Sequence, residues 1–348
     1  MKKALITGIT GQDGAYLSKL LLDKGYEVYG ALRRSEEMNI GKLRYLGIDS
    51  KIKFVPFELA DFSNIYKTIV TVQPDEIYNL AAQASIRLAF EEPGYTTDIN
   101  GIAVLRLLEA IRSINPKIKF FQASTSDVFG KAKVMPQNEM TPFNPMNPFG
   151  TSKAFGHWTT VNYRESYDIF ACSGILFDHD SPLRVHQSVP GLIANAAVRI
   201  KMGLQDKLTL GNIDFSRDLG YAEEYVKAMW LMLQQQKPDD YVIATGETHT
   251  VREFIETAFN SVGIPIEWSG KGQAEKGIDS KTGKTIMTLE LRFPSVNPAS
   301  AAALIRSHSD VTIPSKGDYS KAKNILGWEP KVKYKELFKM MVDFDDKP

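Results

Sequence analysis

The sequence predicts an α/β fold in which a doubly wound parallel sheet is joined to a smaller, mixed α/β lobe. Two observations support this prediction. Short apolar runs alternate with helical stretches through the first half of the 348-residue chain, and apolar strands in that rhythm are typical of a parallel sheet covered on both faces. A glycine-rich segment over residues 8–14 also joins the first apolar run to the first helical stretch, as in sheets that bind nucleotides.

The elements of the first half are expected to follow one another as strand and helix. The expected strands span residues 4–7, 27–30, 52–57, 76–79 and 119–122, and the expected helices span residues 16–24, 63–71 and 104–111. Right-handed crossovers between successive parallel strands would place these helices on both faces of the sheet.

The second half is less regular. A long helix is expected after Lys153, and the apolar run over residues 169–177 predicts a strand that ends near Leu176. The later expected elements are a helix over residues 222–234, a strand over 241–244, and a helix that begins at a capping box of Thr250 and Glu253. Residues 270–316 are rich in Gly, Ser, Lys and Pro and show only weak periodicity. We therefore expect a nucleotide-binding domain over residues 1–176, to which segments near 216–246 return, and a mainly substrate-binding lobe over residues 177–348.

The composition excludes several classes of function. The chain has 42 lysines and arginines against 41 aspartates and glutamates, a formal net charge of +1, and no block of like charge favours nucleic acid or a membrane surface as a partner. No apolar run reaches about 18 residues and the N-terminal apolar stretch is short, so we expect no membrane span, no signal peptide and a cytoplasmic location. The single cysteine, Cys172, excludes an internal disulfide, and its apolar surroundings predict a buried thiol.

Three glycines lie between the first strand and the first helix. Gly8, Gly11 and Gly14 have the spacing G-x-x-G-x-x-G. Glycine permits a tight turn and lets backbone amides approach a pyrophosphate at the N-terminus of a helix. The loop therefore predicts a dinucleotide site, and the alternative is a plain strand-to-helix turn. The same loop contains Thr10, Gln12 and Asp13.

The end of the second strand indicates which dinucleotide is bound. An acid there would bind the 2′-hydroxyl of NAD, but the sequence has Arg33, Arg34 and Ser35. Two guanidinium groups and a hydroxyl suit a 2′-phosphate, so NADP is favoured over NAD, and the alternative is a solvated basic turn. Glu58, after the third strand, is expected on the adenine side of the cofactor.

Two other polar clusters carry no matching function. Residues 178–180 (Asp-His-Asp) could ligate a metal, but the remaining histidines show no ligand spacing. We expect a loop with ordinary hydrogen bonds there and no metal site. Residues 124–126 (Ser-Thr-Ser) are expected in a loop after a strand, but no G-x-S-x-G turn accompanies them, and a serine hydrolase is not expected.

Longer segments resemble one enzyme family. Residues 5–14 (LITGITGQDG), 72–83 (VQPDEIYNLAAQ), 122–126 (QASTS), 161–167 (VNYRESY), 174–177 (GILF), 240–246 (DYVIATG) and 326–330 (LGWEP) are similar to GDP-mannose 4,6-dehydratases. These enzymes lie within the extended short-chain dehydrogenase/reductase family, which has a Rossmann-type fold. The similarity covers nearly the whole chain except about residues 288–316.

The resemblance implies a redox-neutral dehydration of a nucleotide sugar. In the family, a tyrosine deprotonates the sugar C4 hydroxyl while hydride passes to bound NADP. A glutamate then removes the C5 proton, water leaves from C6, and the hydride returns to C6.

Carried onto this chain, the resemblance gives four catalytic positions. The threonine that hydrogen-bonds the reacting hydroxyl is Thr125, and the lysine that binds the nicotinamide ribose is Lys153. The glutamate position holds Asp127 and the tyrosine position holds Phe149. Aspartate retracts the carboxylate by one methylene and phenylalanine has no proton to exchange, so weakened or altered activity is expected.

The resemblance also implies further binding residues. Implied cofactor contacts, besides those of the glycine loop and Glu58, are Leu59, Leu80, Ala81 and Ala82, and implied substrate contacts are Ser85, Asp178, Arg184 and Arg217. The substrate half departs from the family in several places. Residues 178–182 read Asp-His-Asp-Ser-Pro where the family has Asn-His-Glu-Ser-Pro, and the family's Phe-Arg-Pro-x-Glu signature has no clear counterpart. The family's Thr-Arg-Lys segment reads Pro-Gly-Leu at residues 190–192, and its tryptophan after Asp218 is Leu219.

Three functions remain open from the sequence. The first is an NADP-dependent nucleotide-sugar 4,6-dehydratase of the GDP-mannose type, with weakened activity. The second is another sugar-nucleotide oxidoreductase or epimerase, and the third is a catalytically silent NADP-binding protein. The resemblance implies a homodimer or homotetramer.

Overall fold

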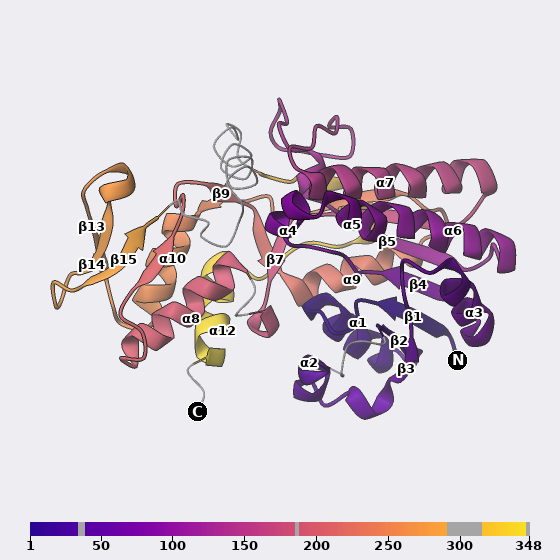
Figure 1. Ribbon diagram of the computed structural model, residues 1–348, viewed down its shortest axis with the longest axis horizontal. Helices are drawn as coiled ribbons and strands as arrows, with labels where there is room; N and C mark the ends of the chain where they lie inside the picture. The colour runs from indigo at the N-terminus through magenta and orange to yellow at the C-terminus, as the bar shows by residue number, and fades with distance from the viewer. Residues whose placement is uncertain (34–38, 185–187, 291–314, 346–348) are drawn as a thin grey trace.

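A seven-stranded parallel sheet forms the centre of the larger lobe (Figure 1). The computed structural model describes residues 1–33, 39–184, 188–290 and 315–345. Within them the strand order is β11-β6-β5-β4-β1-β2-β3, which confirms the predicted fold class. The strands are β1 (Lys3–Thr7), β2 (Glu27–Leu32), β3 (Lys53–Pro56), β4 (Glu76–Asn79), β5 (Lys119–Thr125), β6 (Ala171–Leu176) and β11 (Asp240–Ile243).

Helices cover both faces of this sheet. One face carries α1 (Gln12–Asp23), α2 (Gly41–Tyr45) and α9 (Ala222–Leu233), and the other carries α3 (Phe62–Val72), α6 (Ala103–Ile114) and α7 (Pro148–Tyr167). Successive side chains of a strand point to opposite faces, so Phe121 packs in the core with α1 and α9 while Phe120 packs in the core with α3 and α6. The parallel strands are therefore apolar on both faces, which is why they read as continuous apolar runs.

The smaller lobe has a separate apolar core. The helices α8 (Val189–Lys201), α10 (Val251–Ser261) and α12 (Tyr334–Asp345) pack around it, beside a four-stranded sheet of order β13-β14-β15-β8. These strands are β13 (Ile266–Ser269), β14 (Lys276–Asp279), β15 (Thr285–Leu289) and β8 (Leu208–Leu210). Helix α10 begins at the predicted capping box, in which Thr250 and Glu253 bond reciprocally.

Two short strand pairs lie between the lobes. In one, β7 (Asp178–Asp180) pairs in parallel with β10 (Leu219–Tyr221), and in the other, β9 (Ser216–Arg217) pairs antiparallel with β12 (His249–Thr250). The remaining described elements are α4 (Ile86–Glu91), α5 (Pro93–Thr97) and the short helical turns η1 (Asp49–Lys51), η2 (Asp98–Ile102), η3 (Ser126–Val128), η4 (Pro182–Arg184), η5 (Gly272–Ala274) and η6 (Ala322–Leu326).

Three local predictions are wrong, and two strands lie where none was assigned. Residues 178–180 form strand β7 rather than a loop, because β10 offers them a ladder partner. Ser124 and Thr125 end strand β5 instead of lying in a loop after it. Helix α7 begins before Lys153, at Pro148, because proline suits the first position of a helix and Asn147 caps it by accepting a hydrogen bond from Gly150 N. Residues 276–289 contain two antiparallel strands despite their weak periodicity; residues 291–314 lie outside the described ones.

Two further expectations concern single features. Cys172 is buried, as predicted, and burial raises the pKa of its thiol to about 12. Across the described ranges, none of the helices combines the length and apolar character needed to cross a membrane.

Candidate active site

The glycine loop packs against the segment that follows β4. Gly8 has a φ of +69°, and a Cβ added there would lie 2.8 Å from the backbone nitrogen of Ala81. A Cβ on Gly14 would lie 2.4 Å from the Gly8 carbonyl oxygen. Only glycine fits at either place, and the loop thereby brings residues 80–82 beside the start of α1. Two groups of predicted cofactor contacts, residues 8–14 and residues 80–82, are therefore far apart in the sequence but adjacent in the structure.

The N-terminus of α1 offers unsatisfied polar groups. Its N-cap is Gly11, which supplies no side-chain cap, so the first amides of the helix are available to an anion. Asp13 Oδ1 and Ser124 Oγ are buried and have no hydrogen-bond partner within the described residues. A helix N-terminus for a pyrophosphate, with two buried polar atoms for hydroxyl groups, fits a dinucleotide.

The other oxygen of Asp13 is held by a histidine that sequence reasoning did not assign. His179 Nε2 lies 2.9 Å from Asp13 Oδ2, and His179 Nδ1 lies 2.7 Å from the Phe177 carbonyl oxygen. Burial lowers the pKa of His179, but the Asp13 carboxylate and the carbonyl outweigh it, so the pKa is raised. Both ring nitrogens face acceptors, which favours the imidazolium. The pair joins the glycine loop to β7.

Four predicted catalytic residues gather where β5 meets α7. Thr125 ends β5, and its Oγ1 accepts a hydrogen bond of 3.2 Å from Asp127 N. A Cβ on Gly150 would lie 2.7 Å from the Asp127 carbonyl oxygen, so the turn with Asp127 packs on the first turn of α7. That turn carries Phe149, and Lys153 lies one turn later.

Lys153 is a buried amine. It is 5% exposed, and its Nζ donates a hydrogen bond of 2.9 Å to the Ala123 carbonyl oxygen. Burial lowers the pKa of Lys153 to about 8, against the opposing effect of the Asp13 carboxylate. The ring centre of Phe149 lies 5.9 Å from this Nζ. Phe149 therefore occupies the place where the resemblance predicts a phenol beside an ammonium group.

Comparison with known proteins decides the family. A family model described as GDP-mannose 4,6 dehydratase matches residues 5–341. The chain is 44% identical to the GDP-mannose 4,6 dehydratase of Cricetulus griseus, over 99% of this chain and 91% of that protein. It is 43% identical to the GDP-mannose 4,6-dehydratase of Yersinia enterocolitica, over 99% of this chain and 94% of that protein. The chain belongs to the GDP-mannose 4,6-dehydratase family.

Solved structures share the fold. A UDP-glucose 4-epimerase from Thermotoga maritima with UDP-glucose superposes with a TM-score of 0.78 at 22% identity, over 98% of each chain. A dTDP-glucose 4,6-dehydratase from Bacillus anthracis in complex with NAD gives a TM-score of 0.77 at 19% identity, over 99% of this chain and 96% of that one. At this identity the likeness shows a Rossmann-type fold common to dehydratases and epimerases.

The residues predicted to bind the adenine end of the cofactor follow β2 and β3. Arg33 lies directly after β2, and its Nη1 is 3.5 Å from the Tyr95 hydroxyl. Arg34 and Ser35 lie outside the described residues. Glu58 and Leu59 follow β3; Glu58 accepts a bond of 3.4 Å from Ala60 N, and Leu59 packs in the core beside α3.

The predicted substrate residues are only partly brought together. Asp178 and Arg217 form an ion pair of 3.0 Å. Arg184 Nη1 lies 3.4 Å from the His179 carbonyl oxygen in β7. Ser85 instead caps α4, accepting a bond of 3.2 Å from Leu88 N. In this family member, the arginine predicted to bind the nucleotide is thus already paired with a predicted substrate residue.

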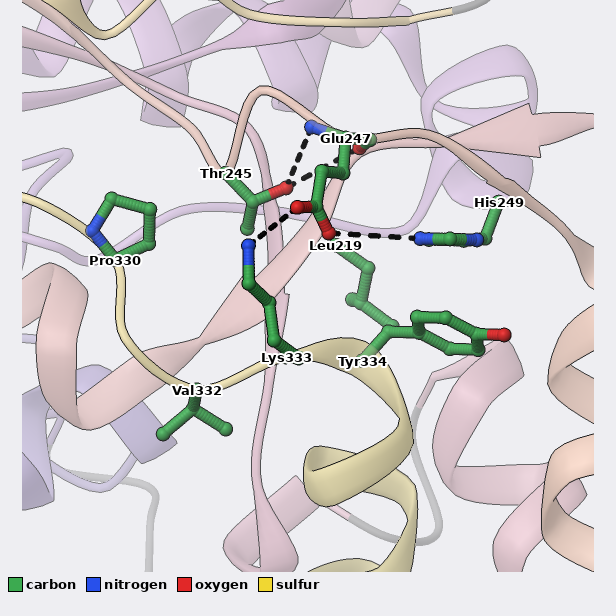
Figure 2. Close-up of a pocket in the computed structure, with 8 residues that line it drawn as sticks. All are labelled: Leu219, Thr245, Glu247, His249, Pro330, Val332, Lys333 and Tyr334. Carbon is green, nitrogen blue, oxygen red and sulfur yellow. Dashed lines mark hydrogen bonds and ion pairs between the residues drawn. The ribbon is translucent and has the colours of Figure 1, made fainter.

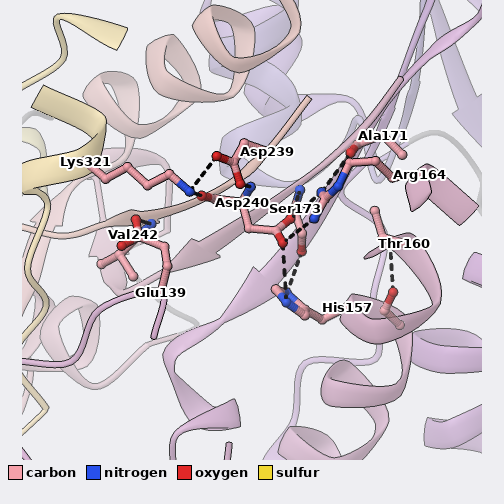
Figure 3. Close-up of polar contacts among 11 residues, drawn as sticks. Glu139, His157, Thr160, Arg164, Ala171, Ser173, Asp239, Asp240, Val242 and Lys321 are labelled. Carbon is pink, nitrogen blue, oxygen red and sulfur yellow. Dashed lines mark hydrogen bonds and ion pairs between the residues drawn. The ribbon is translucent and has the colours of Figure 1, made fainter. Parts of the chain in front are cut away.

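Helix α7 is anchored to β6 and β11 by a second polar cluster (Figure 3). Asp240 accepts two bonds from Arg164, of 2.8 and 2.7 Å, and one of 3.0 Å from Ser173 N. His157 Nδ1 lies 2.9 Å from Ser173 Oγ, and its Nε2 lies 3.8 Å from Asp240 Oδ2. Ser173, His157 and Asp240 are arranged in the order of a hydrolase triad. However, Ser173 is fully buried, and Arg164 already binds the Asp240 carboxylate. Burial lowers the pKa of His157, so this cluster fixes α7 with a neutral ring.

A small pocket lies beside Leu219, the position at which the family resemblance predicts tryptophan (Figure 2). Glu247 pairs with Lys333 across it, and His249 stacks on Tyr334 with ring centres 3.7 Å apart. Its lining contains none of the predicted catalytic or cofactor residues; it comprises Leu219, Thr245, Glu247, His249, Pro330, Val332, Lys333 and Tyr334. Glu247 and Lys333 form an ion pair, whereas His249 Nε2 is buried and has no hydrogen-bond partner within the described residues. Because none of the predicted catalytic or cofactor residues lines it, the pocket is not the candidate active site.

Proposed function

We propose that the chain is an NADP-dependent dehydratase that acts on GDP-mannose and yields GDP-4-keto-6-deoxymannose, at a rate weakened by Phe149 and Asp127. Family membership supports the reaction, and one observation carries the site: the buried amine of Lys153 lies beside the turn with Thr125 and Asp127. The nicotinamide cofactor, when bound, accepts a hydride from the sugar and returns it.

The proposal gives each side chain a role. The glycine loop and the first amides of α1 bind the cofactor pyrophosphate, and Lys153 binds the nicotinamide ribose. Thr125 hydrogen-bonds the sugar hydroxyl that reacts. Asp127 removes the C5 proton, with a carboxylate one methylene shorter than that of the family. Phe149 offers no proton acceptor at the C4 hydroxyl, so the first proton transfer lacks its usual base.

Positioned acid–base groups contribute about 10²–10⁴ in rate. A displacement near 1 Å at a reacting group can cost about a hundredfold. The two substitutions together therefore predict turnover well below that of a chain with tyrosine and glutamate at these positions. Cofactor binding does not depend on either group and is expected to be retained.

The first experiment identifies the ligands. The purified protein is denatured and the released nucleotides are separated by chromatography, and the native protein is then incubated with GDP-mannose and NADP. Bound NADP with slow formation of the keto sugar supports the proposal. Release of a different nucleotide sugar would favour another oxidoreductase or epimerase. Bound NADP without any turnover of GDP-mannose, even in the variant Phe149→Tyr with Asp127→Glu, would favour a catalytically silent NADP-binding protein.

The second experiment tests the choice of cofactor. Arg33→Ala with Arg34→Ala should weaken NADP binding far more than NAD binding, because only NADP carries the 2′-phosphate that guanidinium groups bind. Lys24→Ala, at the exposed C-cap of α1, is a control for the loss of a surface cation. Equal losses for both cofactors in the double variant would remove the arginines from this role.

We also propose that the chain assembles as a homodimer or homotetramer, on the basis of the resemblance alone. Sedimentation of the purified protein tests this, and a monomer at micromolar concentration would contradict it.

A further inference from the structure

A continuous chain of buried hydrogen bonds crosses three neighbouring strands and ends at Lys153. Thr7 Oγ1 in β1 donates to Asn79 Oδ1 in β4 at 2.7 Å, and Asn79 Nδ2 donates to Gln122 Oε1 in β5 at 2.8 Å. Gln122 Nε2 then donates to the Ala123 carbonyl oxygen at 2.9 Å. The same carbonyl oxygen accepts the Lys153 ammonium, also at 2.9 Å.

The bonds at Thr7 fix the direction in which every hydrogen bond of this series is donated. Thr7 Oγ1 accepts bonds of 3.1 Å from both Leu80 N and Ala81 N, so its two acceptor sites are used and its single proton must go to Asn79. Asn79 therefore presents its oxygen to Thr7 and its amide hydrogens to Gln122. All the dipoles point the same way, from the backbone after β4 toward Ala123, and bonds arranged in this way strengthen one another.

We propose that Gln122 is a positioning residue for Lys153: it shares the Ala123 carbonyl with the ammonium group and connects that carbonyl, through Asn79 and Thr7, to the loop beside the glycine turn. The Gln122 Nε2 hydrogen carries partial positive charge next to the ammonium. It therefore opposes the charged form of Lys153 while the carbonyl holds the group in place. The inference deepens the proposed function, which makes Lys153 a cofactor ligand.

Two titratable side chains also lie near Lys153, but neither of them bonds to the Ala123 carbonyl oxygen. Asp13 faces Lys153 from α1 and favours its charged form, but that carboxylate is itself paired with His179 from β7. His157 lies one turn further along α7 and is bonded to Ser173 and not to Ala123. Gln122 is the described side chain that shares the acceptor of the ammonium.

The experiment follows the proton of Lys153 directly. The full chain is labelled with ¹³C at the lysine Cε, and the shift of each signal is recorded against pH; the signal lost in Lys153→Met is that of Lys153. Gln122→Met removes the competing hydrogen and should raise the titration midpoint of Lys153 by about one pH unit. Gln122→Glu places a carboxylate there and should raise it further. The expected order is the unmodified chain, then methionine, then glutamate.

Controls separate this role from a general loosening of the fold. His157→Phe disturbs the other polar cluster on α7 and should leave the Lys153 midpoint unchanged. If Gln122→Met fails to fold, a second pair of variants tests the same role. Thr7→Val removes the hydroxyl with which the series of hydrogen bonds begins and should raise the titration midpoint of Lys153 by a smaller amount. Thr7→Ser keeps that hydroxyl and should leave the midpoint unchanged. An unchanged midpoint in the Gln122 and Thr7→Val variants, or an equal change in His157→Phe, would overturn the assignment.

This readout is independent of cofactor binding. If NADP fails to bind the unmodified chain, the proposed function fails while the Lys153 titration still decides the role of Gln122. If NADP binds and the midpoints do not move, the proposed function stands and Gln122 has only a structural role.

Discussion

Restoring a phenol at Phe149 should restore proton transfer at the sugar C4 hydroxyl. Phe149→Tyr adds one oxygen to a ring that already fills the site and is 8% exposed. Hydride can leave C4 readily only as the hydroxyl proton is removed, and a phenyl ring accepts none. We expect Phe149→Tyr to raise the turnover of GDP-mannose by about 10²–10⁴-fold, the usual contribution of a positioned general base.

The structure gives the size of the electrostatic assistance. The ammonium of Lys153 lies 5.9 Å from the ring centre. With the ring centre taken as the position of the phenolate charge and an effective dielectric constant of about 20, the ammonium would favour the ionised phenol by about 2.8 kcal/mol, roughly a hundredfold in its ionisation. The assistance requires the charged lysine. Because burial lowers the pKa of Lys153 to about 8, the assistance is present below pH 8 and fades as the pH rises through that value.

The assay is formation of the 4-keto-6-deoxy product under saturating NADP, for the unmodified chain, Phe149→Tyr, and Phe149→Tyr with Asp127→Glu. The longer carboxylate should raise turnover again by returning the base to reach of C5. Phe155→Tyr is the matched control, because Phe155 is on the same helix and 44% exposed, and it should change nothing. Brisk turnover in the unmodified chain would show that another base acts at C4 and would refute the role given to Phe149. No gain in the double variant, with NADP still bound, would place the defect in the substrate lobe, at Gly191, Leu192 or Leu219.

Three shorter predictions concern the rest of the structure. Cys172 is fully buried with the pKa of its thiol raised to about 12, so a thiol reagent should label it only on unfolding; prompt labelling of the native protein would contradict its placement. Asp240→Ala leaves the guanidinium of Arg164, whose side chain is 13% exposed, without its carboxylate and should lower the free energy of unfolding in a urea titration by up to about 3–5 kcal/mol; a loss under about 1 kcal/mol would show that the pair is not needed. Asp178→Asn should release Arg217 and tighten GDP binding, whereas Arg217→Ala should weaken it; undiminished GDP binding by Arg217→Ala in calorimetry would remove Arg217 from the nucleotide site.

The sheet was predictable because its strands are apolar on both faces. Strand β4 begins and ends where the sequence places it, at Glu76 and Asn79, since the apolar residues are bounded by polar ones. The strands after residue 270 were not predictable. They are short, and the pairing of β14 with β15 shifts register between Gly277 and Ile278, which interrupts the alternation that marks a half-buried strand.

The sequence predicts those residues of the candidate site that lie in a recognisable motif. It does not predict contacts between residues that only the fold brings together. Glycine spacing and family resemblance place Gly8, Thr125 and Lys153. Asp13 and His179 are in contact although they lie 166 positions apart in the sequence, and no local sequence pattern predicts such a pair. Asn79 and Gln122 left a weaker signal, because each is an amide inside an apolar strand and a buried amide needs partners.

The relative size of two departures decides where a defect in activity should appear. The ion pair between Asp178 and Arg217 is partly exposed, at 44% and 27% for the two side chains, and pairs of that kind are worth about 0–1 kcal/mol. A nucleotide diphosphate can displace it at little cost, so substrate affinity should suffer only a few-fold. The missing base at Phe149 costs about 10²–10⁴ in rate, or about 3–5 kcal/mol of barrier. The defect should therefore appear in kcat and leave KM nearly unchanged, and a chain whose KM rises while its kcat stays high would place the main divergence in the substrate lobe instead.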